Sequence, residues 1–430
     1  MNLKPSQCDI KKLSITDHSK SIVIDSNYPE LKLIEYVDTI DIYENVFSPC
    51  ITADIGINDG GSFREKFNIS GDEVFNIEFV GYGNEDPLKY TLNVVEVMSI
   101  LPNTNLRSKV VGLRLASKEL LTDSVSAISK SYSVGTKQIF QDIINNFLGS
   151  KKKLSIEDTK DLPVVVIPYM SPFKAIDFLR QKLVSPKYKS SSFLFFENAE
   201  GYVLTTVEGL FDRASKSKQQ RFFQNEAISE GVKGSASEIT DLDSFHMFSS
   251  YTVKSPVNLN NIFVNGAVKS TITQYDVTTK QYDRRLFENN TQIFFDPTNN
   301  KNPQITTEIF KQYSSGGNKP YFLPYAKYKN TSNPTINFEY DTLAERLCYS
   351  TLFTSQKTFI DIPGNTKIGA GSLIELVVPR YDAKEKKGIN DVESGLYLVT
   401  ACKHSIKIAD TSKFDSHLEL MRFGRGVYQK

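Results

Sequence analysis

The residues best suited to bind a metal ion are thinly spread along the chain. The sequence has four cysteines and four histidines, and no two cysteines form a CxxC pair. Cys402 and His404 are two residues apart in an expected strand, so they share one face, and His417 lies on an expected neighbouring strand. Scattered residues of this kind are more often packed or exposed than bound to zinc. We therefore expect no metal and no other cofactor.

Motifs for covalent or phosphate chemistry do not occur in the sequence. It has no G-x-S-x-G elbow, no GxxxxGK[ST] loop and no HExxH motif. Carboxylate pairs such as Glu73/Glu78 and Asp241/Asp243 could serve in acid–base catalysis. Solvated strand and loop faces explain these pairs more simply, so we expect a protein without enzyme activity.

Two short lysine runs are candidates for contacts with an anion or a protein. Lys151, Lys152 and Lys153 follow Gly149, the expected end of a helix, and we interpret them as a solvated turn. A second run lies in a long loop of mixed charge, which suits an exposed contact with a protein better than one with nucleic acid. The predicted partner-binding residues are Arg380, Lys384, Lys386 and Lys387.

Length and charge limit the class of protein. The 430 residues are enough for two to four domains, and their formal net charge is +1. A protein whose main task is to grip nucleic acid normally has a basic excess. The N-terminus has no apolar signal region, and the longest apolar run, at 163–170, is too short to cross a bilayer. We expect a soluble protein made in the cytoplasm that binds no membrane.

Hydrophobic periodicity changes along the chain. Residues 30–115 are rich in β-branched and aromatic residues separated by Gly, Asn and Pro turns, which predicts a barrel or a sandwich. The middle part predicts helices at 136–148 and 171–184 and a hairpin with strands 193–197 and 202–207. Both faces of this aromatic hairpin are apolar, so we interpret it as buried packing rather than a stacking platform for bases or sugars.

The end of the chain repeats patterns from its beginning, in the same order. Ile77-Glu78-Phe79-Val80 matches Ile374-Glu375-Leu376-Val377. VVEVMSI (94–100) matches TACKHSI (400–406), which pairs Ser99 with Ser405, and a further match pairs Leu113 with Leu418 and Leu115 with Leu420. Three ordered matches predict an internal duplication, with the loop after the first match much longer in the second copy.

These segments resemble one family. SPFKAIDFLRQKLV and SSFLFFENAEGYVLTTVEGL resemble the middle domain of the baseplate hub, or tail hub, subunits of contractile-tailed bacteriophages. IEYVDTIDIYENVFSPCITADIGINDGG resembles the opening strands of that family. NIFVNGAVKSTITQYDVTTKQYD and FIDIPGNTKIGAGSLIELVVPRYD resemble its second barrel. Together the similarity covers most of residues 30–425.

The resemblance implies a β-rich α+β fold in which two tail-tube-like β-barrels flank an α/β module, with an irregular insertion. The expected parts are a first barrel, the α/β module, a connector with the start of the second barrel, the insertion, and the remainder of the second barrel. Their expected ranges are 1–115, 116–212, 213–280, 281–338 and 339–430.

The resemblance also implies a structural role. Such subunits form a homotrimeric ring whose six similar barrels join a sixfold tail tube to a threefold central spike. The implied partners are two further copies, the spike protein, tube or tube-initiator proteins and baseplate wedge proteins, and DNA crosses the lumen without specific binding. The implied location is the tail baseplate of a virion assembled in the host cytoplasm.

Three alternatives remain open at this point. The chain could be the hub part of a type VI secretion spike or of another contractile injection system. It could be a tail-associated hydrolase, against which the missing catalytic constellation counts. A receptor-binding fibre is the third, although repetitive β sequence would be more typical of it.

Overall fold

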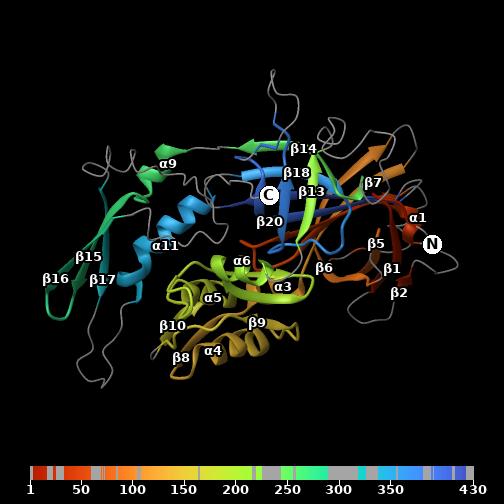
Figure 1. Cartoon of the computed structure of the whole chain (residues 1–430). Helices are drawn as coiled ribbons and strands as arrows, with labels where there is room; N and C mark the ends of the chain where they lie inside the picture. Colours follow the sequence, from red (N-terminus) through yellow and green to blue (C-terminus); the bar gives the residue numbers. More distant parts are fainter. Residues whose placement is uncertain are drawn as a thin grey trace.

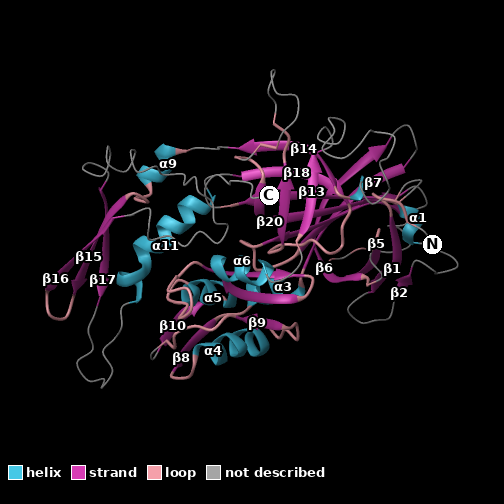
Figure 2. Cartoon of the chain, viewed as in Figure 1, coloured by secondary structure: helices cyan, strands magenta, loops and turns pink. Residues whose placement is uncertain are grey.

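The computed structural model describes most of the chain and is dominated by strands (Figures 1 and 2). The described residues are 3–16, 23–25, 33–59, 69, 71, 73–83, 86–103, 108–162, 165–215, 219–224, 244–254, 258–288, 318–325, 338–354, 357–380, 389–390, 392–408 and 412–422. Within these ranges no helix combines the length and the apolarity needed to cross a bilayer.

Six strands from the second half of the chain close into a barrel. Each strand pairs with the next around the ring, and the pairing of β19 with β20 closes it. The barrel core includes Phe222, Ile360, Leu376, Tyr397 and Leu418, all almost fully buried. In ring order the strands are β13 (Gln220–Gln224), β14 (Met247–Lys254), β18 (Lys357–Pro363), β21 (Lys413–Met421), β20 (Gly395–Lys407) and β19 (Leu373–Val377).

The first half of the chain builds a second curved sheet around its own core, which includes Ile40, Ile55, Phe75, Phe79 and Leu113. Helix α1 (Leu33–Tyr36) precedes β3. Strands β3 and β20 pair in antiparallel fashion, so this sheet and the barrel form one sheet of 13 strands. Its strands are β1 (Cys8–Thr16), β2 (Val23–Asp25), β3 (Val37–Asn45), β4 (Thr52–Asp59), β5 (Val74–Gly81), β6 (Leu88–Asn103) and β7 (Ser108–Ala116).

The strand order repeats between the two halves. The spatial order β5-β6-β7-β4-β3 of the first copy recurs as β19-β20-β21-β18-β14 in the second. The register repeats as well, because Ile77 lies opposite Tyr90 and Ile374 lies opposite Tyr397. The sixth strands differ: β1 is antiparallel to β5, whereas β13 is parallel to β19. The β-rich fold class predicted from the sequence is confirmed.

One detail of the predicted repeat is wrong. Leu113 lies opposite Ile55 and Leu418 opposite Ile360, so these two leucines are equivalent as predicted. Their partners on β6 and β20 are Val97 and Cys402. The sequence match instead aligns Cys402 with Glu96. Because β6 has two bulges in its pairing with β7 and β20 has one in its pairing with β21, the alignment also changes along the strand, from Val97 with Cys402 to Ser99 with Lys403.

The module between the two copies has helices on short sheets. Helix α5 begins after Ser171 with a proline in its first turn, as predicted, and it buries Phe173, Ile176 and Leu179. The predicted helix at 136–148 becomes an α-helix followed by one π-turn. The elements are α3 (Lys118–Val125), β8 (Ile128–Tyr132), α4 (Thr136–Asp142), η1 (Ile143–Phe147), β9 (Leu154–Ile156), β10 (Val165–Met170), α5 (Pro172–Arg180), β11 (Phe193–Asn198), β12 (Gly201–Thr206) and α6 (Val207–Ser215).

The aromatic hairpin β11–β12 is buried on both faces, as predicted. One face joins the core of the module, which includes Phe193 and Phe195, and the other packs on the second barrel through Leu194 and Phe196. The turn requires a glycine at 201, where φ is 128° and a Cβ atom would approach the carbonyl oxygen of Lys153 to 2.3 Å. The hairpin therefore joins the module to the barrel.

A further unit, which we call the arm, projects from the second barrel. Its sheet, in the order β16-β15-β17, is separate from the large sheet. Figure 1 shows the arm on the side of the second barrel that is remote from the first copy. Its elements are α9 (Leu259–Val264), β15 (Lys269–Asp276), β16 (Gln281–Glu288), β17 (Asn318–Tyr325) and α11 (Phe338–Thr354).

The arm corrects two expectations. NIFVNGAVKSTITQYDV, expected at the start of the second barrel, forms α9 and β15 of the arm. Residues 281–288 and 318–325, expected to be irregular, are strands that pair with β15 on either side, and their Tyr, Leu and Phe residues favour a strand. Residues 289–317 and 326–337 of the expected insertion lie outside the described residues. The expected connector contributes β13 to the barrel.

Candidate functional site

The predicted partner-binding loop leaves the second barrel between β19 and β20. Arg380 is exposed at its first end, directly after the bridge that pairs Pro379 with Ile389. Lys384, Lys386 and Lys387 lie outside the described residues. The structure therefore places one of the four predicted residues at the surface and leaves their common role a prediction.

The base of this loop is held by a buried arginine. Arg422 is 1% exposed, and its guanidinium donates hydrogen bonds to the carbonyl oxygens of Ser394 (3.2 Å) and Val392. It also stacks over the ring of Tyr397 at 4.4 Å. On the other side, the backbone amide of Val378 donates to the Ser394 hydroxyl at 2.9 Å. The base of the loop is therefore fixed to the barrel.

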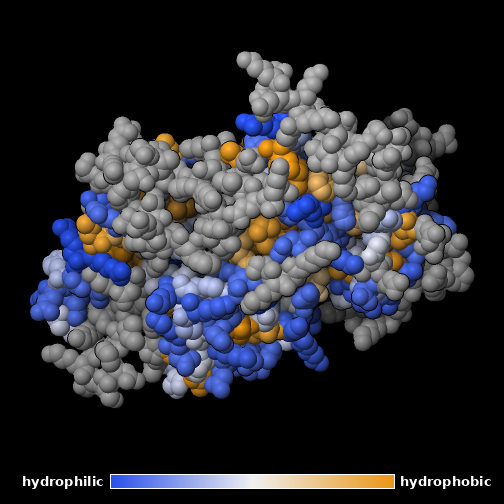
Figure 3. Space-filling model, in the orientation of Figure 1, coloured by the Kyte–Doolittle hydropathy of each residue, from blue (hydrophilic) through white to orange (hydrophobic). Residues whose placement is uncertain are grey.

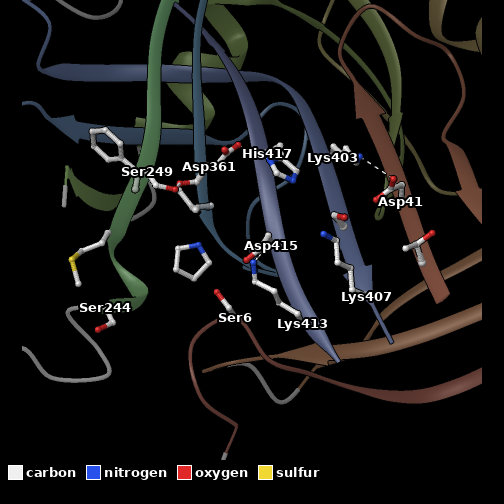
Figure 4. Close-up of a pocket in the computed structure, with 16 residues that line it drawn as sticks. Ser6, Asp41, Ser244, Ser249, Asp361, Lys403, Lys407, Lys413, Asp415 and His417 are labelled. Carbon is white, nitrogen blue, oxygen red and sulfur yellow. Dashed lines mark hydrogen bonds and ion pairs between the residues drawn. The ribbon is translucent and has the colours of Figure 1, made fainter. Parts of the chain in front are cut away.

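A polar groove crosses the joint between β3 of the first half of the chain and β20 of the second half (Figure 4). It has a volume of about 680 Å³ and lies over β3, β20, β21, β18 and β14. Its side chains alternate with core residues along each strand, since Asp41 lies between the buried Ile40 and Ile42. Lining residues include Asp41, Asp361, Asp415, Lys403, Lys413 and His417.

Several polar side chains in the groove contact one another. Lys403 contacts Asp41 across the joint at 2.9 Å, Lys413 contacts Asp415 at 2.7 Å, and His417 Nδ1 contacts Asp361 at 2.5 Å. The same face continues over the first copy, where Arg114 contacts Asp54 at 3.1 Å. Paired charges of alternating sign give a surface with little net attraction for a polyanion.

A buried carboxylate joins the three main parts of the chain. Glu44, on β3, is 2% exposed. It accepts hydrogen bonds from Tyr90 Oη at 3.1 Å, from the Ala199 amide at 3.0 Å and from the Ala370 amide at 3.0 Å. These donors belong to the first sheet, the hairpin turn of the module and the second barrel. Burial raises the pKa of Glu44 to about 7, against the effect of these hydrogen bonds.

A second buried network holds the module to the first copy. The ammonium group of Lys152 contacts Glu119 at 2.6 Å and Glu197 at 2.7 Å, and both carboxylates are nearly inaccessible to solvent. Glu197 also accepts a hydrogen bond from the Ile51 amide at 3.1 Å. The expected solvated turn at 151–153 is therefore wrong for Lys152, because two buried carboxylates on other elements require a cation there.

The residues considered for metal binding or catalysis are occupied in other ways. His404 is buried, its Nδ1 is 3.0 Å from the Ser416 hydroxyl, and burial lowers its pKa to about 4. His417 points to the opposite face of the sheet, into the polar groove. Glu73 accepts a hydrogen bond from the Gly71 amide, and Glu78 contacts Lys89. Asp241 and Asp243 lie outside the described residues. No group of three or more potential metal ligands occurs among the residues that the structure describes.

Sequence reasoning missed Glu44 and Lys152, the residues that join the parts. Glu44 has a weak signal, since it continues the inward alternation of Ile40 and Ile42 along β3. A carboxylate at an inward position predicts a buried hydrogen-bond network. Lys152 has no such signal, because its partners lie 33 and 45 residues away in the chain.

Comparisons with known proteins place this fold among tail proteins. No protein-family model and no curated protein matches the chain. Among solved structures it is similar to a tail protein from Neisseria meningitidis MC58, with a TM-score of 0.56, 9% identity and 96% of each chain covered. It is also similar to the 43 kDa tail protein of prophage MuSo2 from Shewanella oneidensis, with a TM-score of 0.55, 9% identity and coverage of 96% of this chain and 98% of that one. The expected resemblance to phage tail proteins is confirmed at the level of the fold.

Proposed function

We propose that the chain is a structural hub subunit of a phage tail baseplate, not an enzyme. Three copies form a ring that joins the sixfold tail tube to the threefold central spike and leaves a lumen for DNA. The ring is assembled in the host cytoplasm and becomes part of the virion tail. The similarity of the fold to two tail proteins supports this role.

The repeated strand order carries the proposal. Each chain supplies two similar sheets, joined side by side through β3 and β20. Threefold association of a chain with two similar units gives approximate sixfold symmetry, which fits a sixfold partner on one side and a threefold partner on the other.

The joint within the chain suggests how neighbouring copies meet. In the repeat, β14 is equivalent to β3 and β6 is equivalent to β20. Among the described strands, none pairs with the second edge of β6 after Asn93 or with that of β14 after Phe248. In the ring, β14 of one chain pairs with β6 of the next chain, in the same way as β3 pairs with β20 within each chain.

The register of this contact follows from the same equivalence. Within the chain, Lys403 lies opposite Tyr43. Ser99 lies opposite the residue before Leu113, and Lys403 lies opposite the residue before Leu418. Because Leu113 and Leu418 are equivalent, Ser99 is equivalent to Lys403. By the same reasoning Lys254 is equivalent to Tyr43. Ser99 of one copy therefore lies opposite Lys254 of the next.

We assign the polar sheet face to the lumen and the loop at 380–387 to a partner. Within one chain, this face crosses the joint between β3 and β20 without a break. Its paired charges suit the passage of DNA without binding. Arg380, Lys384, Lys386 and Lys387 contact the spike or tube protein from the fixed base of their loop. Serine at all four positions is expected to reduce spike or tube binding in a pull-down assay and to leave the ring intact.

A disulfide cross-link tests the ring. All four native cysteines are buried, so a cross-link reports on the introduced cysteines. The double variant S99C/K254C is expected to form covalent dimers and trimers under mild oxidation. The control S99C/K174C, with its second cysteine on the exposed side of α5, is expected to stay monomeric on a denaturing gel. Equal cross-linking of the two variants, or none in either, contradicts the proposed contact.

A further inference from the structure

The arm has a sheet with one covered face and one uncovered face. On the covered face, Phe287 packs against a small core formed by Ile262, Ala267, Val268 and Cys348. Ile272 of the central strand is 1% exposed. Helices α9 and α11 supply most of this cover. This face of the sheet is therefore packed in a hydrophobic core.

The uncovered face is aromatic where a solvated face would be polar. Because opposite residues share a face, the register places Tyr275 beside Tyr282, and Thr273 beside Arg284 and Phe322. Tyr282 is 70% exposed, Phe322 58% and Leu286 54%. The ring of Tyr275 lies 4.8 Å from that of Tyr282 and 6.2 Å from that of Phe322, so the side chains form one patch.

The composition of this patch is that of a protein interface. Tyr, Phe and Arg are enriched at the centre of such interfaces, where aromatic side chains supply rigid apolar area. A solvated sheet face normally carries polar residues, whereas this face carries two tyrosines, a leucine and a phenylalanine. Figure 3 shows hydrophobic residues among hydrophilic ones at the surface of the arm, on the left of the view.

The position of the arm in the chain identifies the partner. The arm begins at α9, five residues after the end of β14, and returns through α11 to β18. Strand β14 carries the edge of the second barrel that no described strand pairs with after Phe248. In Figure 1 the arm, the second barrel and the first sheet follow one another across the molecule. The arm therefore extends from the side of the chain on which, in the proposed ring, the next copy lies.

We propose that the aromatic face of the arm, formed by Tyr275, Tyr282, Leu286 and Phe322, binds the first sheet of a neighbouring copy and clasps it in the ring. This inference rests on the proposed function, because it needs a ring of copies. It adds a second contact to the pairing of β14 with β6. The arm takes the place that the β3–β4 loop takes inside the chain, since it is the connection between the equivalent strands β14 and β18.

Two serine substitutions test the clasp. The variant Y282S/F322S is expected to weaken trimer formation by on the order of 10²-fold, because exposed aromatic residues of this kind are typical hot spots. The matched control is Y169S on the module, where Tyr169 is 82% exposed. It is expected to form trimers like the wild type. Thermal unfolding of each variant as a dilute monomer verifies that the fold is kept, since all three side chains are exposed.

A photo-cross-linker identifies the surface that the arm touches. With p-benzoylphenylalanine at position 322, in mixtures of isotope-labelled and unlabelled chains, cross-links are expected to residues 1–115 of another copy. Trimers that survive in Y282S/F322S, or cross-links confined to the same chain, overturn the clasp and leave the ring standing. A wild type that remains monomeric contradicts the ring itself.

Discussion

The Ala370 amide donates a hydrogen bond of 3.0 Å to the Glu44 carboxylate, although the two residues are 326 positions apart in the chain. The same carboxylate accepts from Ala199 of the module and from Tyr90 of the first sheet. Gly369 leaves room for it, because a Cβ atom there would lie 2.5 Å from Glu44 Oε2. One buried side chain thus connects the first sheet, the module and the second barrel. The proposed ring requires these three parts to keep fixed positions relative to one another.

Removal of this carboxylate is expected to destabilise the whole chain. Glu44→Ala leaves the Ala370 amide and the Tyr90 hydroxyl buried without an acceptor, and each such group costs roughly 1–3 kcal/mol. We expect a loss of about 3 kcal/mol in the free energy of unfolding, measured by urea denaturation. The control Glu200→Ala changes an exposed carboxylate in the same hairpin and is expected to stay within about 0.5 kcal/mol of the wild type. Equal stability of the two variants contradicts this role of Glu44.

Stability is expected to depend on pH through two buried groups with opposite effects. Burial raises the pKa of Glu44 from 4.5 to about 7, so its contribution is complete below pH 4.5 and is lost as the pH rises through about 7. Burial lowers the pKa of His404 from 6.5 to about 4, so its contribution is present above pH 6.5 and is lost as the pH falls through about 4.

Glu44→Gln separates the two effects. We expect the free energy of unfolding of this variant to increase with pH between 4.5 and 6.5 more steeply than that of the wild type, because only His404 still acts. Urea denaturation at several pH values measures the difference. Parallel profiles for the two proteins would show that Glu44 does not titrate in this range.

Lys152 is expected to be essential to the junction between the module and the first copy. Lys152→Met leaves Glu119 and Glu197 facing each other in a buried site without a cation, and a broken buried ion pair costs roughly 3–5 kcal/mol. Because Lys152 is about one-third exposed, we expect the lower end of that range. Lys151→Met and Lys153→Met change exposed neighbours and serve as controls in the same denaturation series.

The edge of β6 that no described strand pairs with is expected to control assembly rather than folding. Val97 is 41% exposed and Met98 37%, so lysines at both positions are tolerated by the monomer but oppose the addition of a neighbouring strand. The variant V97K/M98K is expected to elute as a monomer in size-exclusion chromatography. V166K on β10 is a matched control, because Val166 is 64% exposed and lies away from this edge. Trimers formed by V97K/M98K would contradict the proposed pairing.

Local patterns in the sequence predict the elements well. Ser171 and Pro172 mark the start of α5, and the apolar residues on both faces of 193–197 predict a strand covered on both sides. The duplication is visible because its matches involve core positions such as Ile77 and Ile374, whose burial restricts their replacement. These features depend on residues close together in the chain or on conserved periodicity between its two halves.

Contacts between distant parts could not be predicted in this way. The state of Lys152 and of the arm segments 281–288 and 318–325 depends on tertiary partners that lie far away in the chain or on a neighbouring strand. The alignment of β6 with the equivalent strand β20 was missed because it is defined by their pairing with β7 and β21, which the sequence does not show. The joint between β3 and β20 depends on an edge-to-edge contact that no local pattern encodes.

The mass of the assembled particle tests the central claim most directly. Native mass spectrometry of the purified chain, alone and mixed with the candidate spike protein, measures the number of copies. The ring predicts a species with three times the chain mass of 48.5 kDa, and a complex with the spike that contains three copies of the chain. A protein that stays monomeric at high concentration, with and without the spike, would contradict it.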